Sequence, residues 1–470
     1  MPIGDLMPEI ALLMGAVTVM LAALLLPRER QGWCAPLALI ALVVSAGLCA
    51  LQWNEAAHLT FSDTWAIDGV SISARLIIVA VAASTVLLCP DWFRSERRHG
   101  EYYAMLLLST LGALLMAGAA DTLQLVMGVL LSSVTGYVMA AYHRDWALSL
   151  EAGMKYFLIG ALTNTLMMIG VTLLFGMLGQ TTYAAMTSGL GGVVPSGALL
   201  LGLTLVVIGL AFKLGAVPAH AWMPDVAEGA PAPAAAFLTT APKIGAAIAL
   251  ARLLMLFPPA AFAWQPLVAA LAAATMTLGN LAALGQTDVR RLIGWSSVSQ
   301  SGYALMAIAV LGRSAEALPA LLFFLAGYAA AQICAFSAVT HLRGRTALDH
   351  YRGLASTRPW IAAALTLSFL SLVGIPPLAG FVGKLTLFVA ALQGGFAWLA
   401  VVAVINTVIS LFYYLKVLSA IYFAPPATAA VAVLGHWSAT ALWVSAMLTL
   451  GLGLAAQPIL DAFRSANMLP

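Results

Sequence analysis

The sequence predicts an all-α polytopic membrane protein with about 14 transmembrane helices, and three observations lead to this fold class. Of the 470 residues, 62% are hydrophobic and only 8% are charged, whereas about a quarter of the residues in a soluble protein are charged. Apolar runs of roughly the 20 residues that a helix needs to cross a bilayer recur along the chain. None of them alternates with period two, as the strands of a membrane barrel do. This composition excludes a soluble enzyme, a disordered protein and a nucleic-acid binder.

Fourteen apolar segments follow one another, joined by short polar or Gly- and Pro-rich connections. They cover about 7–26, 33–51, 69–89, 102–119, 121–141, 155–179, 197–229, 234–256, 265–285, 292–311, 318–342, 361–392, 395–422 and 437–463. No connection is long enough for a soluble domain, so we expect residues 1–470 to form a single membrane domain. We divide it into three N-terminal helices in 1–99, five-helix units in 100–256 and 265–422, and a C-terminal helix in 437–463.

Two of these segments, 197–229 and 361–392, are longer than one crossing needs and contain helix breakers. Pro218 lies in the first segment, and Gly374, Pro376 and Pro377 lie in the second. Proline lacks a backbone donor and clashes with the preceding turn, so both helices should break within the membrane. A broken helix in each half of a transporter is typical of an internal repeat with an ion site. Because the breaks are five segments apart, an odd number, we predict two inverted five-helix repeats, segments 4–8 and 9–13.

The basic connections predict the orientation. If the segments alternate, Arg313 and Arg464 fall on one side and twelve arginines fall on the other. These twelve are Arg28, Arg30, Arg94, Arg97, Arg98, Arg144, Arg290, Arg291, Arg343, Arg345, Arg352 and Arg358. Because basic connections stay in the cytoplasm, both termini are predicted to be periplasmic.

All five lysines lie inside or at the edge of apolar segments. They are Lys155, Lys213, Lys243, Lys384 and Lys416. A charge at the centre of a membrane helix costs about 2.5–3.5 kcal/mol, and such residues commonly mark ion or proton paths. Lys213 and Lys384 adjoin the predicted breaks, and Lys243 lies deep in its segment. We interpret these three as a proton relay; the alternative is that each lysine forms a structural pair or snorkels.

Other polar groups in the segments leave two interpretations open. Glu151 and Lys155, four residues apart, share one helix face and form either a stabilising pair or a pair that modulates a deeper lysine. His220 is either a proton-transfer group near Lys213 or a structural histidine. Arg252, at the end of its segment, is expected to snorkel. The polar stripe of Ser296–Tyr303 either orders water or joins helices.

Nothing in the sequence predicts a metal, a cofactor or a catalytic group on this chain. The four cysteines lie in apolar runs without CxxC spacing and are expected to be packing residues. They are Cys34, Cys49, Cys89 and Cys334. A phosphate loop after a strand, a Ser/His/Asp arrangement and a haem-binding pair are all missing from the sequence.

One stretch of sequence resembles a known family. Residues 212–233, FKLGAVPAHAWMPDVAEGAPAP, followed by FLTTAPK at 237–243, resemble the antiporter-like subunits of respiratory complex I. The PDV-x-EGAP-x-P form is similar to subunit N in particular. Supporting matches lie at 100–104, 151–156, 279–303 and 374–384, so the resemblance covers about residues 100–420.

The resemblance implies a membrane-arm subunit of the proton-translocating NADH:quinone oxidoreductase in the bacterial inner membrane. Other membrane-arm subunits, including another antiporter-like one, would adjoin it in the bilayer. NADH, FMN, iron–sulfur clusters and quinone would belong to other subunits. Residue by residue, the resemblance makes Lys213 the helix-seven lysine, Lys243 the central helix-eight lysine and Lys384 the helix-twelve lysine near the exit. Lys155 would be the helix-six lysine of the family.

Two positions depart from the family. Leu130 stands where the family usually has a glutamate, 21 residues before Glu151, and Gln300 stands where a histidine is frequent. Leucine cannot hold a charge beside Lys213. Either Glu151 or a neighbouring subunit supplies the acid, or the chain conducts poorly. The alternatives to a conducting complex I subunit are therefore an Mrp-type cation/proton antiporter subunit and a structural membrane-arm subunit that has lost conductance.

Overall fold

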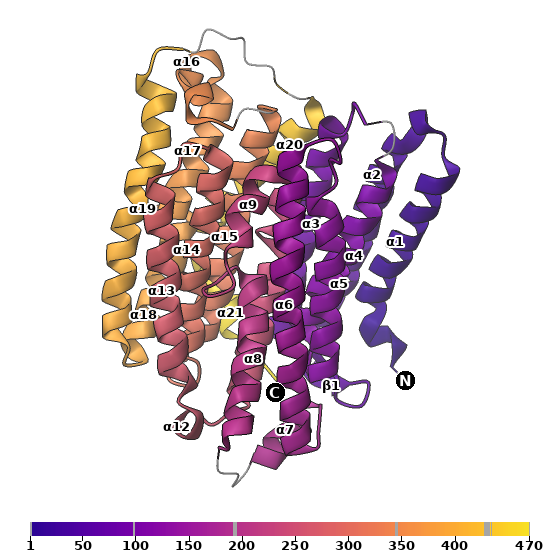
Figure 1. Cartoon of the computed structure of the whole chain (residues 1–470), viewed down its shortest axis with the longest axis vertical. Helices are drawn as coiled ribbons and strands as arrows, with labels where there is room; N and C mark the ends of the chain where they lie inside the picture. Colours follow the sequence, from indigo (N-terminus) through magenta and orange to yellow (C-terminus); the bar gives the residue numbers. More distant parts are fainter. Residues whose placement is uncertain are drawn as a thin grey trace.

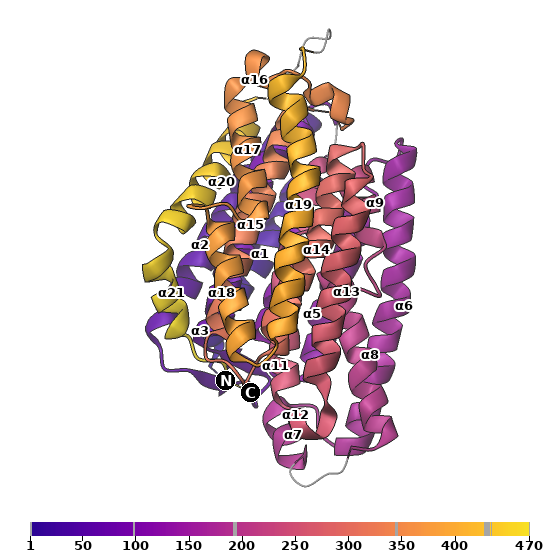
Figure 2. The same ribbon diagram turned by 90° about the vertical axis from the view of Figure 1, so that its left-hand side faces the viewer.

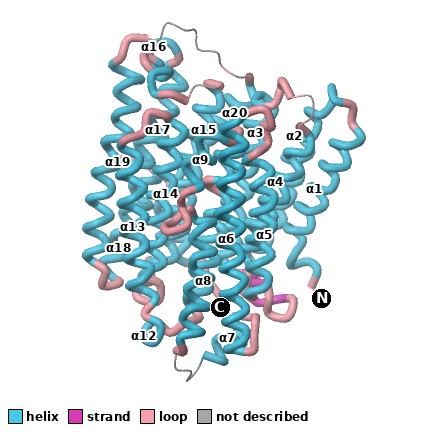
Figure 3. Tube along the Cα trace, viewed as in Figure 1, coloured by secondary structure: helices cyan, strands magenta, loops and turns pink. Residues whose placement is uncertain are grey.

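The computed structural model is a bundle of long helices that run roughly along one axis (Figure 1). It describes residues 2–96, 99–190, 195–343, 346–426, 433 and 435–469, so Arg97, Arg98 and Arg345 lie outside the described residues. Both termini lie towards the same end of the bundle, which we call the lower end; α16 marks the opposite, upper end. A pair of short strands at the lower end interrupts the helical tube (Figure 3).

The first half of the described chain is built from ten helices of the bundle. They are α1 (Met7–Leu25), α2 (Cys34–Leu51), α3 (Gly69–Trp92), α4 (Gly100–Gly118), α5 (Thr122–Ala140), α6 (Ala147–Leu178), α8 (Gly197–Leu214), α9 (Trp222–Gly229), α10 (Ala232–Leu238) and α11 (Ala241–Met255). The second half contributes seven, and its C-terminal helix ends well short of the last residue. They are α13 (Trp264–Leu284), α14 (Val289–Ala309), α15 (Ala317–His341), α17 (Pro359–Val373), α18 (Ala379–Gln393), α19 (Ala397–Phe423) and α20 (His436–Leu454).

Short elements cap the two ends of the bundle. The short helices are α7 (Tyr183–Leu190), α12 (Pro259–Phe262), α16 (Leu354–Thr357) and α21 (Ala456–Arg464), and the 3-10 turns are η1 (Ile3–Leu6), η2 (Arg28–Trp33), η3 (Gln52–Asn54) and η4 (Leu348–Tyr351). Strands β1 (His58–Thr60) and β2 (Trp65–Ile67) pair antiparallel, with His58 opposite Ile67. The sequence did not predict this hairpin.

The predicted fold class is confirmed. Twelve helices of the described chain are long and apolar enough to cross a membrane. Two further crossings complete the fourteen predicted segments: the α17–α18 pair, whose halves are each too short alone, and α14, which is long enough but more polar. All four cysteines are buried and free, as expected of packing residues.

Both predicted breaks are present. Pro218 lies between Leu214, where α8 ends, and the start of α9, and residues 374–378 separate α17 from α18. Gly374 has φ of +100°, a conformation that other residues rarely adopt. The α8–α9 pair runs from the lower to the upper end and α17–α18 runs the opposite way (Figure 2), as inverted units require. The boundaries of the two units stay a prediction.

Two predicted segment boundaries are wrong, and a third segment has the predicted extent but is interrupted inside it. The segment 234–256 is interrupted between α10 and α11, because Pro242 in the first turn of α11 cannot continue the hydrogen-bond ladder. The segment 437–463 ends at Leu454 and turns into α21, whose first turn contains Pro458. The α6 helix begins eight residues before 155, because its first turns are too polar for an apolar run.

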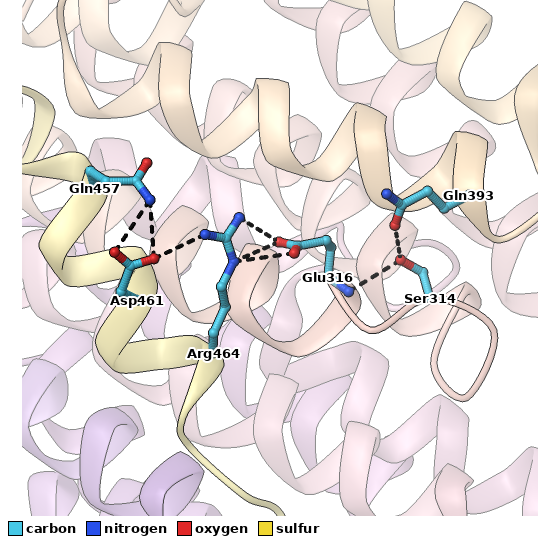
Figure 4. A network of polar contacts seen from close by, with 6 residues as sticks. All are labelled: Ser314, Glu316, Gln393, Gln457, Asp461 and Arg464. Atoms are coloured by element: carbon cyan, nitrogen blue, oxygen red, sulfur yellow. Dashed lines mark hydrogen bonds and ion pairs between the residues drawn. The ribbon is translucent and has the colours of Figure 1, made fainter.

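The residues after α20 form what we call the C-terminal strap, α21 and residues 465–469. The α21 helix packs on α15, and Arg464 holds Glu316 at 3.1 Å and Asp461 at 3.0 Å (Figure 4). The tail then reaches a buried ion pair between Arg252 and Asp68, 2.7 Å apart. Asp68 accepts a hydrogen bond from the Leu469 N–H at 2.9 Å, and Arg252 donates to the Leu469 carbonyl at 2.6 Å.

Arg252 does not snorkel, so that expectation is wrong. Its side chain is fully buried, and the partner that neutralises it, Asp68, is the residue that caps α3. A buried charge is tolerated when it is paired and hydrogen-bonded. The pair therefore replaces the contact with water that snorkelling would have given.

Candidate functional site

Three buried lysines lie at interruptions of the membrane helices. Lys213 is the penultimate residue of α8, Lys243 is the third residue of α11, and Lys384 is the sixth of α18. Their exposed fractions are 1%, 0% and 3%. An interrupted helix leaves backbone carbonyls without their usual partners, and Lys384 lies against two such carbonyls at the end of α17.

Lys213 is held by a hydroxyl and by aromatic rings. Its Nζ donates to Ser132 Oγ on α5 at 3.3 Å. The same atom lies 5.9 Å from the ring centre of Tyr156 and 5.6 Å from that of Phe212, within cation–π range. Among the described residues, no carboxylate lies within ion-pair distance of this amine. Leu130 packs against the apolar core instead.

Lys243 belongs to a connected polar cluster. Its Nζ donates to the carbonyl and the hydroxyl of Ser297 on α14, at 2.6 and 2.7 Å, and lies 3.3 Å from Tyr328 Oη on α15. The carbonyl of Thr239, in the gap between α10 and α11, accepts hydrogen bonds from Ser297 Oγ at 3.3 Å and Tyr328 Oη at 2.8 Å. Hydroxyls both donate and accept, so this cluster can pass a proton to or from the amine.

Lys384 is bound to the end of the broken helix α17. Its Nζ donates to the carbonyls of Leu372 and Val373, at 2.9 and 3.0 Å, and lies 4.4 Å from the ring centre of Tyr303. The C-terminal end of a helix carries partial negative charge, and the amine of Lys384 lies against it. Gln300 donates to the same Leu372 carbonyl at 3.1 Å.

The polar stripe of α14 reaches both breaks and the central lysine. Ser301 Oγ donates to the carbonyl of Leu214, at the end of α8, at 2.5 Å. Ser297 holds Lys243, and Gln300 holds the end of α17. Ser296 bonds to Tyr414 on α19. Of the two interpretations left open by the sequence, these contacts support the joining of helices.

Glu151 and Lys155 form the expected pair, 2.6 Å apart, within a larger network. Lys155 also lies 3.1 Å from Asp225 on α9, and Arg291 on α14 bridges Asp225 at 2.6 Å and Glu228 at 2.7 Å. These residues line a pocket of about 230 Å³. The Lys155 side chain is 43% exposed, and such pairs add little to stability. Among the described residues, no hydrogen bond or ion pair joins this network to Lys213, Lys243 or Lys384.

The structure does not bring His220 and Lys213 into contact. The His220 ring packs 5.8 Å from the Trp295 ring, and its Nδ1 is buried without a hydrogen-bond partner among the described residues. In the described part of the chain, no hydrogen bond joins the side chains of His220 and Lys213. Its proton-transfer role stays a prediction.

One described group has the ligands to hold a metal ion. Asp5, Glu55 and His58 bring one ligand atom each within 4.8 Å of one another. They lie on η1, after η3 and on β1, elements that the sequence did not predict.

Sequence reasoning missed several of the residues around the lysines. Thr239, Tyr328 and Tyr156 contact them or their partners from other helices. A hydroxyl among apolar residues is the one signal that could have found them, and it does not say which lysine each one contacts.

The comparisons with known proteins agree with one another. Residues 119–410 match the family described as NADH:quinone oxidoreductase/Mrp antiporter, transmembrane. The chain is 44% identical to NADH-quinone oxidoreductase subunit N 1 of Streptomyces griseus subsp. griseus, over 98% of each chain. It is also 44% identical to subunit N of Mycobacterium sp. (strain JLS), over 97% of each.

Solved structures share the fold. A chain of respiratory complex I from Thermus thermophilus superposes with a TM-score of 0.84 at 30% identity, covering 97% of this chain and 99% of that one. A chain of the Mrp complex from Dietzia sp. superposes with a TM-score of 0.87 at 21% identity, covering 99% and 97%, a likeness of fold alone. The chain belongs to the NADH:quinone oxidoreductase/Mrp antiporter family of transmembrane proteins.

Proposed function

We propose that this chain is the antiporter-like subunit N of a proton-translocating NADH:quinone oxidoreductase and that it carries protons through Lys213, Lys243 and Lys384. Relatives of almost equal length that bear the subunit N name support the assignment to the complex. The observation that carries the proton path is the position of the three amines. Each is buried at a helix interruption, and α14 connects the end of α8, Lys243 and the end of α17.

Each lysine acts by holding and releasing one proton. Burial disfavours the charged form of an amine, while the Ser297 hydroxyl and the end of α17 stabilise it at Lys243 and Lys384. Small changes in nearby charge can therefore load or unload each amine. Each proton that moves against 100 mV costs about 2.3 kcal/mol, so the path must be gated and cannot be an open file of water.

In this proposal, the redox chemistry takes place elsewhere in the complex. NADH, FMN, the iron–sulfur clusters and quinone are bound by other subunits, and this chain is a non-redox part of the translocase. Charge movement that starts at the quinone site shifts the proton affinity of Lys213, then Lys243, then Lys384, which lies nearest the exit.

The membrane setting follows from the basic connections. The connection that contains α16 lies at the upper end, opposite both termini (Figure 1), and it carries Arg352 and Arg358. We assign the upper end to the cytoplasm and both termini to the periplasm of a bacterial inner membrane. The neighbours are lipid and other membrane-arm subunits, including another antiporter-like subunit.

Lysine substitutions in the reconstituted complex test this function. Lys243→Ala and Lys384→Ala should each lower the number of protons pumped per electron, while NADH oxidation in uncoupled vesicles continues. Lys416→Ala is the matched control, because Lys416 is an exposed lysine on α19 that donates to the Gln286 carbonyl at 3.0 Å. If both buried variants pump at the normal ratio, the proposed proton path is wrong.

A second candidate, a structural subunit that has lost conductance, is favoured by one observation. Among the described residues, no carboxylate pairs with Lys213, and the partly buried Leu130 packs against the apolar core. An Mrp-type antiporter subunit has weaker support, because the Mrp chain from Dietzia shares only the fold at 21% identity.

A further inference from the structure

Two buried polar atoms near Lys213 have no hydrogen-bond partner among the described residues. They are Tyr156 Oη and Asn164 Oδ1, both on α6. The Tyr156 side chain is fully buried and Asn164 is 5% exposed. A buried polar group without a partner costs about 1–3 kcal/mol, and such groups are ordinarily satisfied by internal water. Both atoms therefore indicate water between α5 and α6.

The surrounding groups extend this polar site to Lys213. Asn164 Nδ2 donates to Ser133 Oγ at 3.2 Å and to Tyr137 Oη at 3.3 Å, which leaves its carbonyl oxygen able to accept from water. The Tyr137 ring packs edge-on against Tyr156 with centres 4.9 Å apart.

The Tyr156 ring lies on the other side against the amine of Lys213. Ser132, which accepts the hydrogen bond from that amine, is adjacent to Ser133 on α5. The two unsatisfied atoms thus lie in one cluster of polar and aromatic side chains that adjoins Lys213 through the Tyr156 ring.

The hydroxyl groups of Tyr137 and Tyr156 each pack against a glycine, where a larger residue would leave less space. A Cβ at Gly160 would lie 2.1 Å from Tyr137 Oη, and a Cβ at Gly136 would lie 3.1 Å from Tyr156 Oη. Any side chain at position 160 would have to displace the hydroxyl. The backbone is therefore shaped to admit both hydroxyl groups at this point.

We infer that Tyr137, Tyr156 and Asn164 hold the water that delivers a proton to Lys213, in the place of a carboxylate on α5. The inference rests on the proposed function and adds the donor for its first lysine. In the transfer, an O–H bond of a protonated water breaks, an N–H bond forms on the neutral Nζ, and neutral water stays behind. The three side chains are positioning residues, because they orient the water and do not themselves change charge.

The test compares variants in the purified complex, reconstituted in liposomes. Asn164→Leu removes the amide at similar volume and should lower the proton-to-electron ratio to the level of Lys213→Ala. Asn164→Gln keeps the amide and adds no acid, so it should pump at a higher proton-to-electron ratio than Asn164→Leu. Tyr156→Phe removes only the hydroxyl, so it is the variant to use if Asn164→Leu does not assemble. The control is Thr165→Val, an exposed neighbour whose hydroxyl bonds to its own helix at Ala161.

A second measurement detects the proposed water directly. A cryo-EM map of the complex should show water density within hydrogen-bond distance of Asn164 Oδ1 and Tyr156 Oη, and Asn164→Leu should remove it. If Asn164→Leu pumps normally while Lys213→Ala does not, the inference is wrong and the proposed function stands. If Asn164→Gln pumps no better than Asn164→Leu, the role of Asn164 is structural and the inference is also wrong. Normal pumping by Lys213→Ala and Lys243→Ala as well would overturn the proposed function itself.

Discussion

Replacing Asp68 by Asn should destabilise the chain strongly, because it removes the charged partner of a buried arginine. Asp68 Oδ2 lies 2.7 Å from Arg252 and also accepts from the Leu469 N–H. The Nε and Nη2 atoms of Arg252 already lack partners in the described part of the chain. An asparagine amide would present either an uncharged oxygen or an N–H donor to these donors.

The magnitude follows from separating the two roles of Asp68. It caps α3 by accepting from the Ser71 N–H at 2.7 Å, and asparagine caps helices about as well as aspartate. The cost therefore arises from leaving Arg252 as an uncompensated buried charge, which is about 3–5 kcal/mol in comparable cases. Removing both charges, as in Asp68→Asn with Arg252→Met, should recover a large part of this loss.

The free energy of unfolding of the purified chain in detergent measures the effect, with Asp121→Asn as the control. Asp121 caps α5 through the Leu123 and Gln124 N–H groups, at 2.7 and 3.1 Å, and pairs with no described arginine or lysine. Its substitution should cost less than about 0.5 kcal/mol. Equal destabilisation by Asp68→Asn and Asp121→Asn would refute the reasoning.

The stability difference between wild type and Asp68→Asn should also depend on pH. Burial alone would raise the pKa of Asp68, but the Arg252 guanidinium and the N–H groups of Ser71 and Leu469 lower it below its usual value. A carboxylate with a lowered pKa stabilises the fold above its unfolded-state value and loses that contribution as the pH falls through the folded-state value. The difference between wild type and Asp68→Asn should therefore be constant near neutral pH and shrink below about pH 4.

Three further predictions concern other parts of the chain. Leu130→Glu should raise proton pumping by the reconstituted complex only modestly if water already loads the first lysine; a severalfold gain would favour a subunit that has lost conductance. Glu316→Gln removes an exposed ion pair with Arg464, so it should lower the free energy of unfolding by less than about 1 kcal/mol. A loss of stability that does not diminish in high salt would contradict this. Burial lowers the pKa of His143, with Glu96 opposing the shift, so neutral His143 stabilises the fold above its usual pKa of about 6.5 and that contribution disappears as the pH falls. His143→Gln should flatten the loss of stability between about pH 7 and 5, and an unchanged profile would show that another group titrates there.

Breaks that involve proline in mid-segment could be predicted from the sequence. Pro218 and the Gly374–Pro377 run interrupt long apolar stretches, so residue type alone indicates that each helix must end there. The interruption before Lys243 was not predicted, although Pro242 occupies the first turn of α11, where proline is common. As a result, the depth of Lys243 was predicted, but its link to the Thr239 carbonyl through Ser297 and Tyr328 was not.

Contacts that join distant residues could not be predicted. The partner of Arg252 lies 184 residues away, and nothing in either segment specifies the other. The α14 stripe was recognised as polar, but its acceptors at Leu214 and Leu372 are backbone carbonyls. A carbonyl becomes free through the path of the chain and leaves no trace in residue type, which is why the stripe remained ambiguous.

The polarity of α14 has a consequence for the synthesis of the chain. Although it is long enough to cross, α14 is not among the helices apolar enough to do so by composition. Its acceptor at Leu214 is made before it and its acceptor at Leu372 is made after it, so a nascent chain that stops between them holds a polar helix without its Leu372 partner. We therefore expect the stable insertion of α14 to depend on α17, so that the two halves of the protein insert interdependently.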